Sequence, residues 1–225
     1  MSAEPHEGEN QSSGQPQPTG EPGGFTQEVK HQQVTARVPE KIGPGVFSTG
    51  ALVLHGQHEF VLDFVVGIAK PHQIASRVIM PFSLVPSFIA ALRENLANFA
   101  KRFGPPPALP TPPPNTTPPS IEEIYDQLKQ PEDVMTGCYA NFVMIAHTPS
   151  EFCFDFITNF YPRSAVSARV FLSAPQVPRL LDTLTRSFDQ YQQKVRQMQQ
   201  QMQQPTQPPR PPSTEGPHPP PSSML

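Results

Sequence analysis

The sequence GVFSTGALVLHGQHEFVLDFVV at residues 45–66 recurs as GCYANFVMIAHTPSEFCFDFIT at residues 137–158, without an insertion or a deletion. The same offset of 92 continues downstream, so that residues 45–103 align with residues 137–195. A duplication separates the residues of the common fold from those that belong to one copy. The chain is therefore predicted to contain two copies of one folding unit, repeat 1 (residues 33–104) and repeat 2 (residues 137–204).

Proline marks the segments outside the repeats. The chain has 225 residues and 32 prolines, of which nine lie in residues 105–119 and nine in residues 205–221. Helices and sheets do not tolerate that density. We predict a disordered N-terminal tail, a Pro-rich linker, a short helix with a lead-in, and a disordered Pro-rich tail, at residues 1–32, 105–119, 120–136 and 205–225.

Charge and hydropathy narrow the class of protein. The formal net charge is -3, and residues 45–104 carry five basic and three acidic side chains. This is short of the basic footprint that would identify a nucleic-acid-binding protein from charge alone. The sequence has no apolar run typical of a signal peptide or a membrane span. We expect a cytoplasmic protein without a membrane partner.

The two cysteines, Cys138 and Cys153, align with Val46 and Val61 in the other copy. Because an apolar side chain fills both places there, the cysteines are interpreted as core thiols rather than as a disulfide or a nucleophile.

Two β-rich runs joined by a short turn open each repeat. The turns are Gly56-Gln57-His58 and Thr148-Pro149-Ser150, of a length that suits a β-hairpin. A third short strand should follow after a loop that differs between the copies. The predicted strands are residues 46–55, 59–66 and 77–80 in repeat 1, and residues 138–147, 151–157 and 169–172 in repeat 2.

An amphipathic helix is predicted to end each repeat, because apolar residues recur three or four positions apart. They are Phe88, Leu92, Leu96, Phe99 and Phe103 in repeat 1, and Leu180, Leu184, Phe188, Tyr191 and Val195 in repeat 2. The second helix should continue to Pro205. Its heptad-like apolar spacing leaves oligomerisation through residues 188–202 open.

The two repeats are predicted to begin differently. Gln33–Val38 alternates as an additional strand would, whereas repeat 2 has the capping box Ser120-Ile121-Glu122-Glu123. A short helix is therefore expected to replace the first strand of repeat 2. The predicted order is ββββα and then αβββα. This is an α+β fold in which two ββ(β)βα repeats pack as an intramolecular pseudo-two-fold dimer.

A polar set also occurs twice. Alternation along the hairpin should place Phe60, Leu62, Phe64 and Val66 on the core face and the carboxylates on the other, with the histidine opposite the glutamate across the turn. We predict these polar residues as candidate binding residues: His55, Glu59, Asp63, Arg77, His147, Glu151, Asp155 and Arg169.

Three interpretations of this set remain open. It could be a structural salt-bridge ladder, a recognition surface for a protein or a nucleic acid, or the active site of a small hydrolase. As a ladder, it predicts similar, modest stability losses for Asp63→Ala and Asp155→Ala. Glu59 and Asp63 would lie about 13 Å apart along a strand, too far for a general acid and base. No catalytic residue, metal site or cofactor is predicted, because the set lacks the spacing of zinc ligands.

Repeat 2 carries a recognisable pattern, Gly137-Cys138-Tyr139-Ala140-Asn141 followed by residues 147–156 (HTPSEFCFDF) and Arg169-Val170. It resembles a family of short prokaryotic proteins known as domain of unknown function 3467. Repeat 1 keeps most of this pattern but has a different turn. The resemblance implies that each copy is equivalent to one complete small protein, and it implies no activity.

The predicted ββββα order is also similar in topology to the PC4, Whirly and Pur-alpha single-strand-binding proteins. Those proteins use basic sheet faces that carry aromatic residues, whereas here the predicted outer face carries carboxylates. We therefore expect a non-enzymatic binding or scaffold protein with a protein partner. Single-stranded nucleic-acid binding is the alternative.

Overall fold

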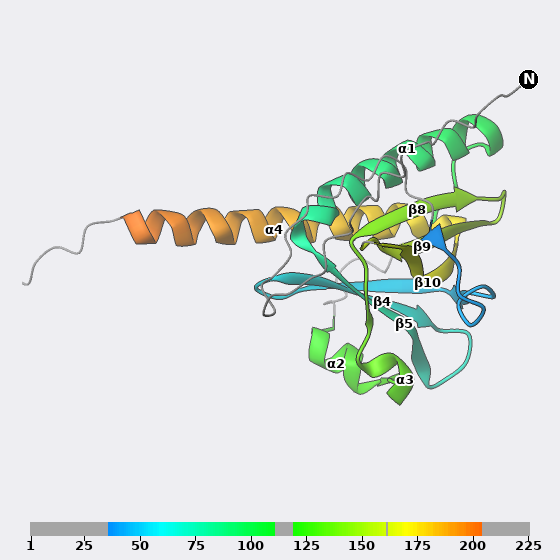
Figure 1. Ribbon diagram of the computed structural model, residues 1–225, viewed down its shortest axis with the longest axis horizontal. Helices are drawn as coiled ribbons and strands as arrows, with labels where there is room; N and C mark the ends of the chain where they lie inside the picture. The colour runs from blue at the N-terminus through cyan, green and yellow to red at the C-terminus, as the bar shows by residue number, and fades with distance from the viewer. Residues whose placement is uncertain (1–35, 111–118, 161, 204–225) are drawn as a thin grey trace, which may run out of the picture. The chain divides into compact units, whose positions relative to one another are not determined.

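The computed structural model describes residues 36–110, 119–160 and 162–203 (Figure 1). The predicted tails and the middle of the predicted linker lie outside these residues. Repeat 1 comprises β1 (Ala36–Arg37), β2 (Val46–Ser48), β3 (Gly50–His55), β4 (Glu59–Val66), β5 (His72–Pro81) and α1 (Val85–Phe103). The segment from the linker onward comprises α2 (Ile121–Asp126), β6 (Leu128–Lys129), α3 (Glu132–Met135), β7 (Cys138–Tyr139), β8 (Phe142–His147), β9 (Glu151–Thr158), β10 (Ser164–Ser173) and α4 (Val177–Gln203).

The two copies exchange strands. In one sheet, β3, β4 and β5 pair antiparallel, and β6 and β7 from the second half of the chain pair parallel to β5. In the other sheet, β8, β9 and β10 are completed by β1 and β2 from repeat 1. Val46 pairs with Val170 and Cys138 pairs with Val78, which are equivalent positions at the offset of 92. The predicted α+β pseudo-two-fold dimer is confirmed, with each sheet finished by the other copy.

This exchange divides the long β-rich run that opens each repeat. The sequence predicts one strand over residues 46–55, but the strand changes sheets at Thr49, between β2 and β3. Ser48 is fully buried at the change, where its hydroxyl donates to the Gly50 carbonyl at 2.6 Å and its oxygen lies 3.2 Å from the Val65 carbonyl oxygen. In repeat 2 the change occurs at Ala140 and Asn141. An uninterrupted β-rich run in the sequence does not reveal that the strand changes the strand with which it pairs.

The first strand of repeat 2 is present, so the prediction that a helix replaces it was wrong. β6 lies 92 residues after β1, and each pairs in parallel with the long third strand of the other copy. The predicted helix precedes this strand as α2. The Ser120 hydroxyl accepts from the Glu123 amide, and the Glu123 carboxylate accepts from the Ser120 amide. The capping box is thus confirmed.

The third strands are longer than the sequence predicts. β5 and β10 each span ten residues, whereas the predictions covered four. Both strands start within the segments predicted as loops, and both contain a register shift against the preceding strand. The bulges interrupt the simple alternation on which the prediction relied.

One hydrophobic core contains residues of both copies. Phe60, Phe64, Phe152, Phe154 and Phe156 are fully buried. The Phe64 ring centroid lies 5.6 Å from that of Phe156 and 6.4 Å from that of Phe154, so phenylalanines of the two sheets meet directly. The predicted core face of β4 is confirmed, apart from a half-buried Val66. A unit of about 60 residues is close to the lower limit for an independent core, and sharing enlarges it.

Each long helix also packs against the sheet of the other copy. α1 contacts β8 of repeat 2, α4 contacts β3 of repeat 1, and the helices pack against each other (Figure 1). Their predicted apolar faces supply the buried Phe88, Leu92, Leu180 and Leu184. The apolar side chains at the C-terminal end of α4 are exposed. Met198 is 53% accessible and Met202 is 79% accessible. Oligomerisation through residues 188–202 stays a prediction.

A glycine begins each exchanged strand. Gly45 and Gly137 have φ angles of +65° and +68°, which L-residues rarely adopt. A Cβ on Gly45 would lie 2.6 Å from the Phe171 ring and 2.8 Å from Arg169 Cγ, and one on Gly137 would lie 2.8 Å from Arg77 Cγ. The exchange therefore requires glycine at both positions, for conformation and for space.

Gly45→Ala and Gly137→Ala should each lower the free energy of unfolding by about 2–4 kcal/mol, because strain and overpacking add. The measurement is urea unfolding. Gly50→Ala is the matched control, since nothing lies within 4 Å of its added Cβ, and it should change stability by less than about 0.5 kcal/mol. Equal effects at positions 45 and 50 would contradict the close approach.

Candidate functional site

The aspartate and arginine of the predicted polar set form an ion pair in each copy. Arg77 Nε and Nη2 donate to the two carboxylate oxygens of Asp63, each at 2.7 Å. Arg169 donates to Asp155 in the same bidentate way, also at 2.7 Å. The paired residues are direct cross-strand neighbours in both sheets. The ion pair raises the pKa of both arginines, so these guanidinium groups stay charged.

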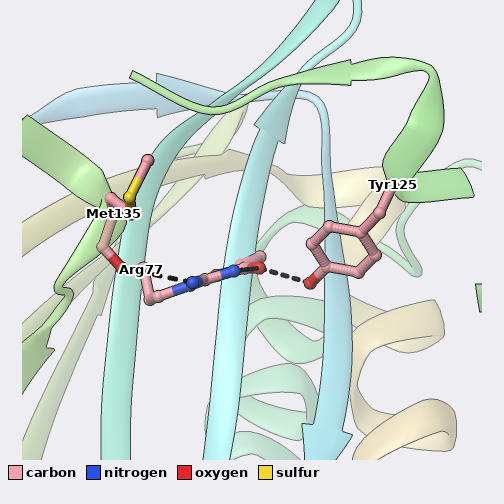
Figure 2. Close-up of polar contacts among 4 residues, drawn as sticks. Arg77, Tyr125 and Met135 are labelled. Atoms are coloured by element: carbon pink, nitrogen blue, oxygen red, sulfur yellow. Dashed lines mark hydrogen bonds and ion pairs between the residues drawn. The ribbon is translucent and has the colours of Figure 1, made fainter. Parts of the chain in front are cut away.

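The third nitrogen of each guanidinium binds the other copy. Arg77 Nη1 donates to the Met135 carbonyl at 3.2 Å (Figure 2). Arg169 Nη1 donates to the Gly43 carbonyl, also at 3.2 Å. Positions 43 and 135 are equivalent, and both lie just before an exchanged strand. We call each Asp–Arg–carbonyl arrangement a crossover clamp. The clamp explains the duplicated pair structurally, since it fixes the segment that passes between the sheets.

The two clamps differ in burial. The Asp63 side chain is fully buried and also accepts a hydrogen bond from the Tyr125 hydroxyl of α2 (Figure 2), whereas the Asp155 side chain is 18% exposed. Burial, followed by this bond to Asp63, raises the pKa of Tyr125 well above its ordinary value. The position equivalent to Tyr125 is Gln33, outside the described residues. The face predicted as solvated is therefore covered at Asp63.

The histidines do not join the clamps. His55 pairs across the hairpin with Phe60, not with Glu59 as predicted, and it faces the helix side of its sheet. Its ring lies 6.3 Å from that of Tyr191, and the ring of His147 lies 5.7 Å from that of Phe99. Tyr191 and Phe99 are equivalent positions on α4 and α1. Each histidine thus contacts the exchanged helix of the other copy.

The glutamates also lie apart from the ion pairs. Glu59 is the cross-strand neighbour of Pro81, and Glu151 accepts a hydrogen bond from the Thr148 hydroxyl at 2.8 Å. The glutamates lie on the predicted face but away from the ion pairs, and the prediction was wrong for His55, which lies on the opposite face. Alternation assigns a residue to a face, but it does not show whether a strand end is close enough to join a central pair.

The cysteines are free and occupy different environments. Cys138 packs against the core, and burial raises the pKa of its thiol to about 11. Cys153 lies on the opposite face of β9, where its sulfur is 3.9 Å from the Asp155 carboxylate. Burial and that carboxylate raise the Cys153 pKa. The interpretation as a core thiol holds for Cys138 and was wrong for Cys153.

An apolar row that was not predicted from the sequence lies on the outer face of each sheet, opposite the helices. Cross-strand neighbours share a face, so the register defines two equivalent rows: Leu54–Val61–Ile79–Tyr139 and Ala146–Cys153–Phe171–Phe47. Each row crosses four strands and ends in an aromatic residue of the other copy. Phe47 is 44% exposed and Tyr139 is 41% exposed. The sequence signal that could have indicated these rows is that aromatic residues occupy two equivalent positions, 47 and 139.

Further aromatic and apolar side chains lie near these rows. The Tyr139 ring stacks on the Phe160 ring, with centroids 5.9 Å apart and 5° between the planes. Phe160 is 55% exposed, and Met144, opposite Asp155, is 49% exposed. Exposed apolar groups that gather in this way mark interaction surfaces more often than single exposed residues do.

Two further features bear on the class of site. Within residues 36–110, 119–160 and 162–203, no three His, Cys, Asp or Glu side chains are grouped closely enough to hold a metal ion. No helix in the described part of the chain is both long and apolar enough to cross a membrane.

The unequal burial predicts unequal effects of the two aspartates, in place of the similar losses expected from sequence. Asp63→Ala should cost about 3–5 kcal/mol, because it leaves a half-buried guanidinium without its partner. Asp155→Ala should cost about 1–2 kcal/mol, because water can reach that pair. Urea unfolding measures both. Glu59→Ala, on the same strand but outside the clamp, is the control; equal losses for the two aspartates would refute the role assigned to burial.

Alkaline pH should weaken the fold. Because the pKa of Cys138 is raised in the folded protein, the unfolded chain releases this proton first as the pH rises. The unfolding free energy should therefore fall between about pH 9 and pH 11. Cys138→Val should flatten this part of the curve. Denaturant titrations across that range measure the effect, and an unchanged slope in the variant would count against it.

The comparisons with known proteins agree with the duplication. The family model described as "Protein of unknown function (DUF3467)" matches residues 6–107 and again residues 110–200. A search of curated proteins finds no match. The second matched segment includes α2 and β6, which lie ahead of the repeat boundary predicted from sequence. Because the two matches together span most of its length, this chain belongs to the DUF3467 family of proteins of unknown function, as two tandem copies.

Proposed function

We propose that this chain is a non-enzymatic binding protein that takes a partner polypeptide on the outer faces of its two sheets. The observation that carries the proposal is the pair of equivalent apolar rows, each ending in an exposed aromatic side chain. Aromatic residues are enriched in protein–protein interfaces because they bury a large area at low entropic cost. Duplication presents this surface twice on one chain.

The charge of the outer face favours a polypeptide. The two arginines on this face, Arg77 and Arg169, are each engaged by a carboxylate and by a backbone carbonyl. Their charge is therefore largely compensated, whereas single-strand binding relies on a positively charged groove. An apolar row beside compensated ion pairs suits the mixed apolar and polar surface of a folded or extended protein partner.

Single-stranded nucleic acid is the second candidate, and the stacked rings of Tyr139 and Phe160 favour it. Exposed aromatic rings are platforms on which bases stack. Hydrolysis receives no support from the contacts, because His55 packs toward Tyr191 whereas Asp63 is engaged by Arg77 and Tyr125. Our proposal therefore gives the predicted polar set no catalytic role.

The cytoplasm is the compartment that we propose. The two cysteines are unpaired in the fold, as is usual for proteins of a reducing compartment. Self-association through the exposed end of α4 is compatible with this proposal, since Met198 and Met202 lie away from the apolar rows on that helix.

The double variant Phe47→Ser/Tyr139→Ser should lose the partner while the fold stays stable. Removing interface aromatics typically costs about 2 kcal/mol or more in binding, roughly 30-fold. The measurement is affinity capture from native lysate with the full chain and with the variant. Met202→Ser, which removes an exposed apolar side chain of α4, is the control and should capture the same proteins as the unmodified chain.

Two results would count against the proposal. One is that the double variant retains every protein that the unmodified chain retains. The other is saturable binding of a labelled single-stranded oligonucleotide at low salt, with a steep decline as salt is added, because that dependence reports phosphate neutralisation.

A further inference from the structure

A cavity of about 210 Å³ lies where the two copies meet. Its fourteen lining residues form seven pairs at the offset of 92, so both copies contribute every position. Gly45 and Gly137 belong to this lining, as do both clamp arginines, Arg77 and Arg169. The cavity therefore lies at the pseudo-two-fold interface between the repeats. Only the assembled pair of repeats forms it.

The arginines bring hydrogen-bond donors to this cavity. A guanidinium has five N–H donors, and each clamp uses three of them, two on a carboxylate and one on a carbonyl. Two donors are left on Arg169, whereas the Tyr125 hydroxyl also interacts with Arg77. Both side chains are partly accessible, at 19% and 23%. The lining also includes the hydroxyl-bearing Ser76 and Ser167.

One pair in the lining breaks the symmetry. Position 41 is a lysine and its equivalent, position 133, is an aspartate, and both side chains are exposed. Among the described residues, no carboxylate lies within ion-pair distance of Lys41. The lining thus holds Lys41, the two ion-paired arginines Arg77 and Arg169, and one carboxylate, Asp133.

We propose that this cavity between the two repeats binds a small oxyanion, either a free phosphate or a small carboxylate. The aspartates that pair with the arginines are not in the lining, and Asp63 is fully buried. Both arginines belong to the lining and carry donors that the clamps do not use, and arginine is well suited to phosphate and carboxylate groups. The volume is about seven times the ~30 Å³ that a water molecule occupies in the liquid. The cavity volume is below the roughly 300–1,000 Å³ that is typical of pockets for drug-sized ligands.

The test uses the full chain and amide chemical shifts of Gly45 and Gly137. Inorganic phosphate and malonate are the two probes, and sodium chloride at matched ionic strength is the reference. We expect saturable shifts with at least one probe and none with chloride. Saturation by phosphate alone, or by malonate alone, identifies the source of the oxyanion.

Charge variants at the asymmetric pair test the sign of the site. Lys41→Glu should weaken binding of the oxyanion, and Asp133→Lys should strengthen it, each by about fivefold or more for a charge close to a surface ligand. Neither substitution touches a clamp, so both variants should fold. Lys70→Glu, an exposed lysine outside the lining, is the matched control and should leave affinity unchanged.

The proposal is overturned if neither probe gives saturable shifts, or if chloride gives the same shifts. It is also overturned if Asp133→Lys weakens binding or if Lys70→Glu has the same effect as Lys41→Glu. These outcomes do not bear on the apolar rows, whose aromatic residues are outside the lining.

Discussion

One guanidinium per copy holds the junction on which the rest of this fold depends. Arg77 binds a carboxylate of its own sheet on one edge and a carbonyl of the other copy's crossover segment with its third nitrogen. Arg169 makes the same three contacts in the opposite direction. Because an exchanged strand has only two or three residues, its own hydrogen bonds are few. A charge-assisted contact at its start adds an anchor that the short strand cannot supply.

This arrangement gives the duplicated residues distinct structural roles. The glycine before each exchanged strand admits the arginine side chain, the aspartate orients the guanidinium, and the histidine contacts the exchanged helix. A single copy would present exchanged strands without a sheet to join and a helix without its edge strand. Two copies are therefore the smallest unit in which these contacts are satisfied, and a chain that contains both forms the unit without association.

Much of the fold could be predicted from the sequence, and the exchange could not. Constant spacing identified the two copies, period-two alternation identified the buried phenylalanines, and the helical period located α1 and α4. Alternation does not specify which strand lies alongside, so residues 46–55 read as one strand although two sheets share them. The Asp–Arg pairs follow from register, but their third contact, at a carbonyl 58 or 126 residues away, has no local signal. The apolar rows could be indicated only by the two equivalent aromatic positions, because the pairing that completes each row involves a strand of the other copy.

The most direct test of the exchange is a nuclear Overhauser spectrum of the full chain, with assigned amide and Hα protons. If the copies exchange strands, cross-strand contacts join residues 46–48 to residues 170–172 and residues 138–139 to residues 78–79. A regular parallel-strand ladder of amide–Hα contacts between residues 46–48 and residues 78–80 of their own repeat, in place of the ladder with residues 170–172, would refute the exchange. That ladder would mean that each copy closes its own sheet and that the crossover clamps do not exist as described.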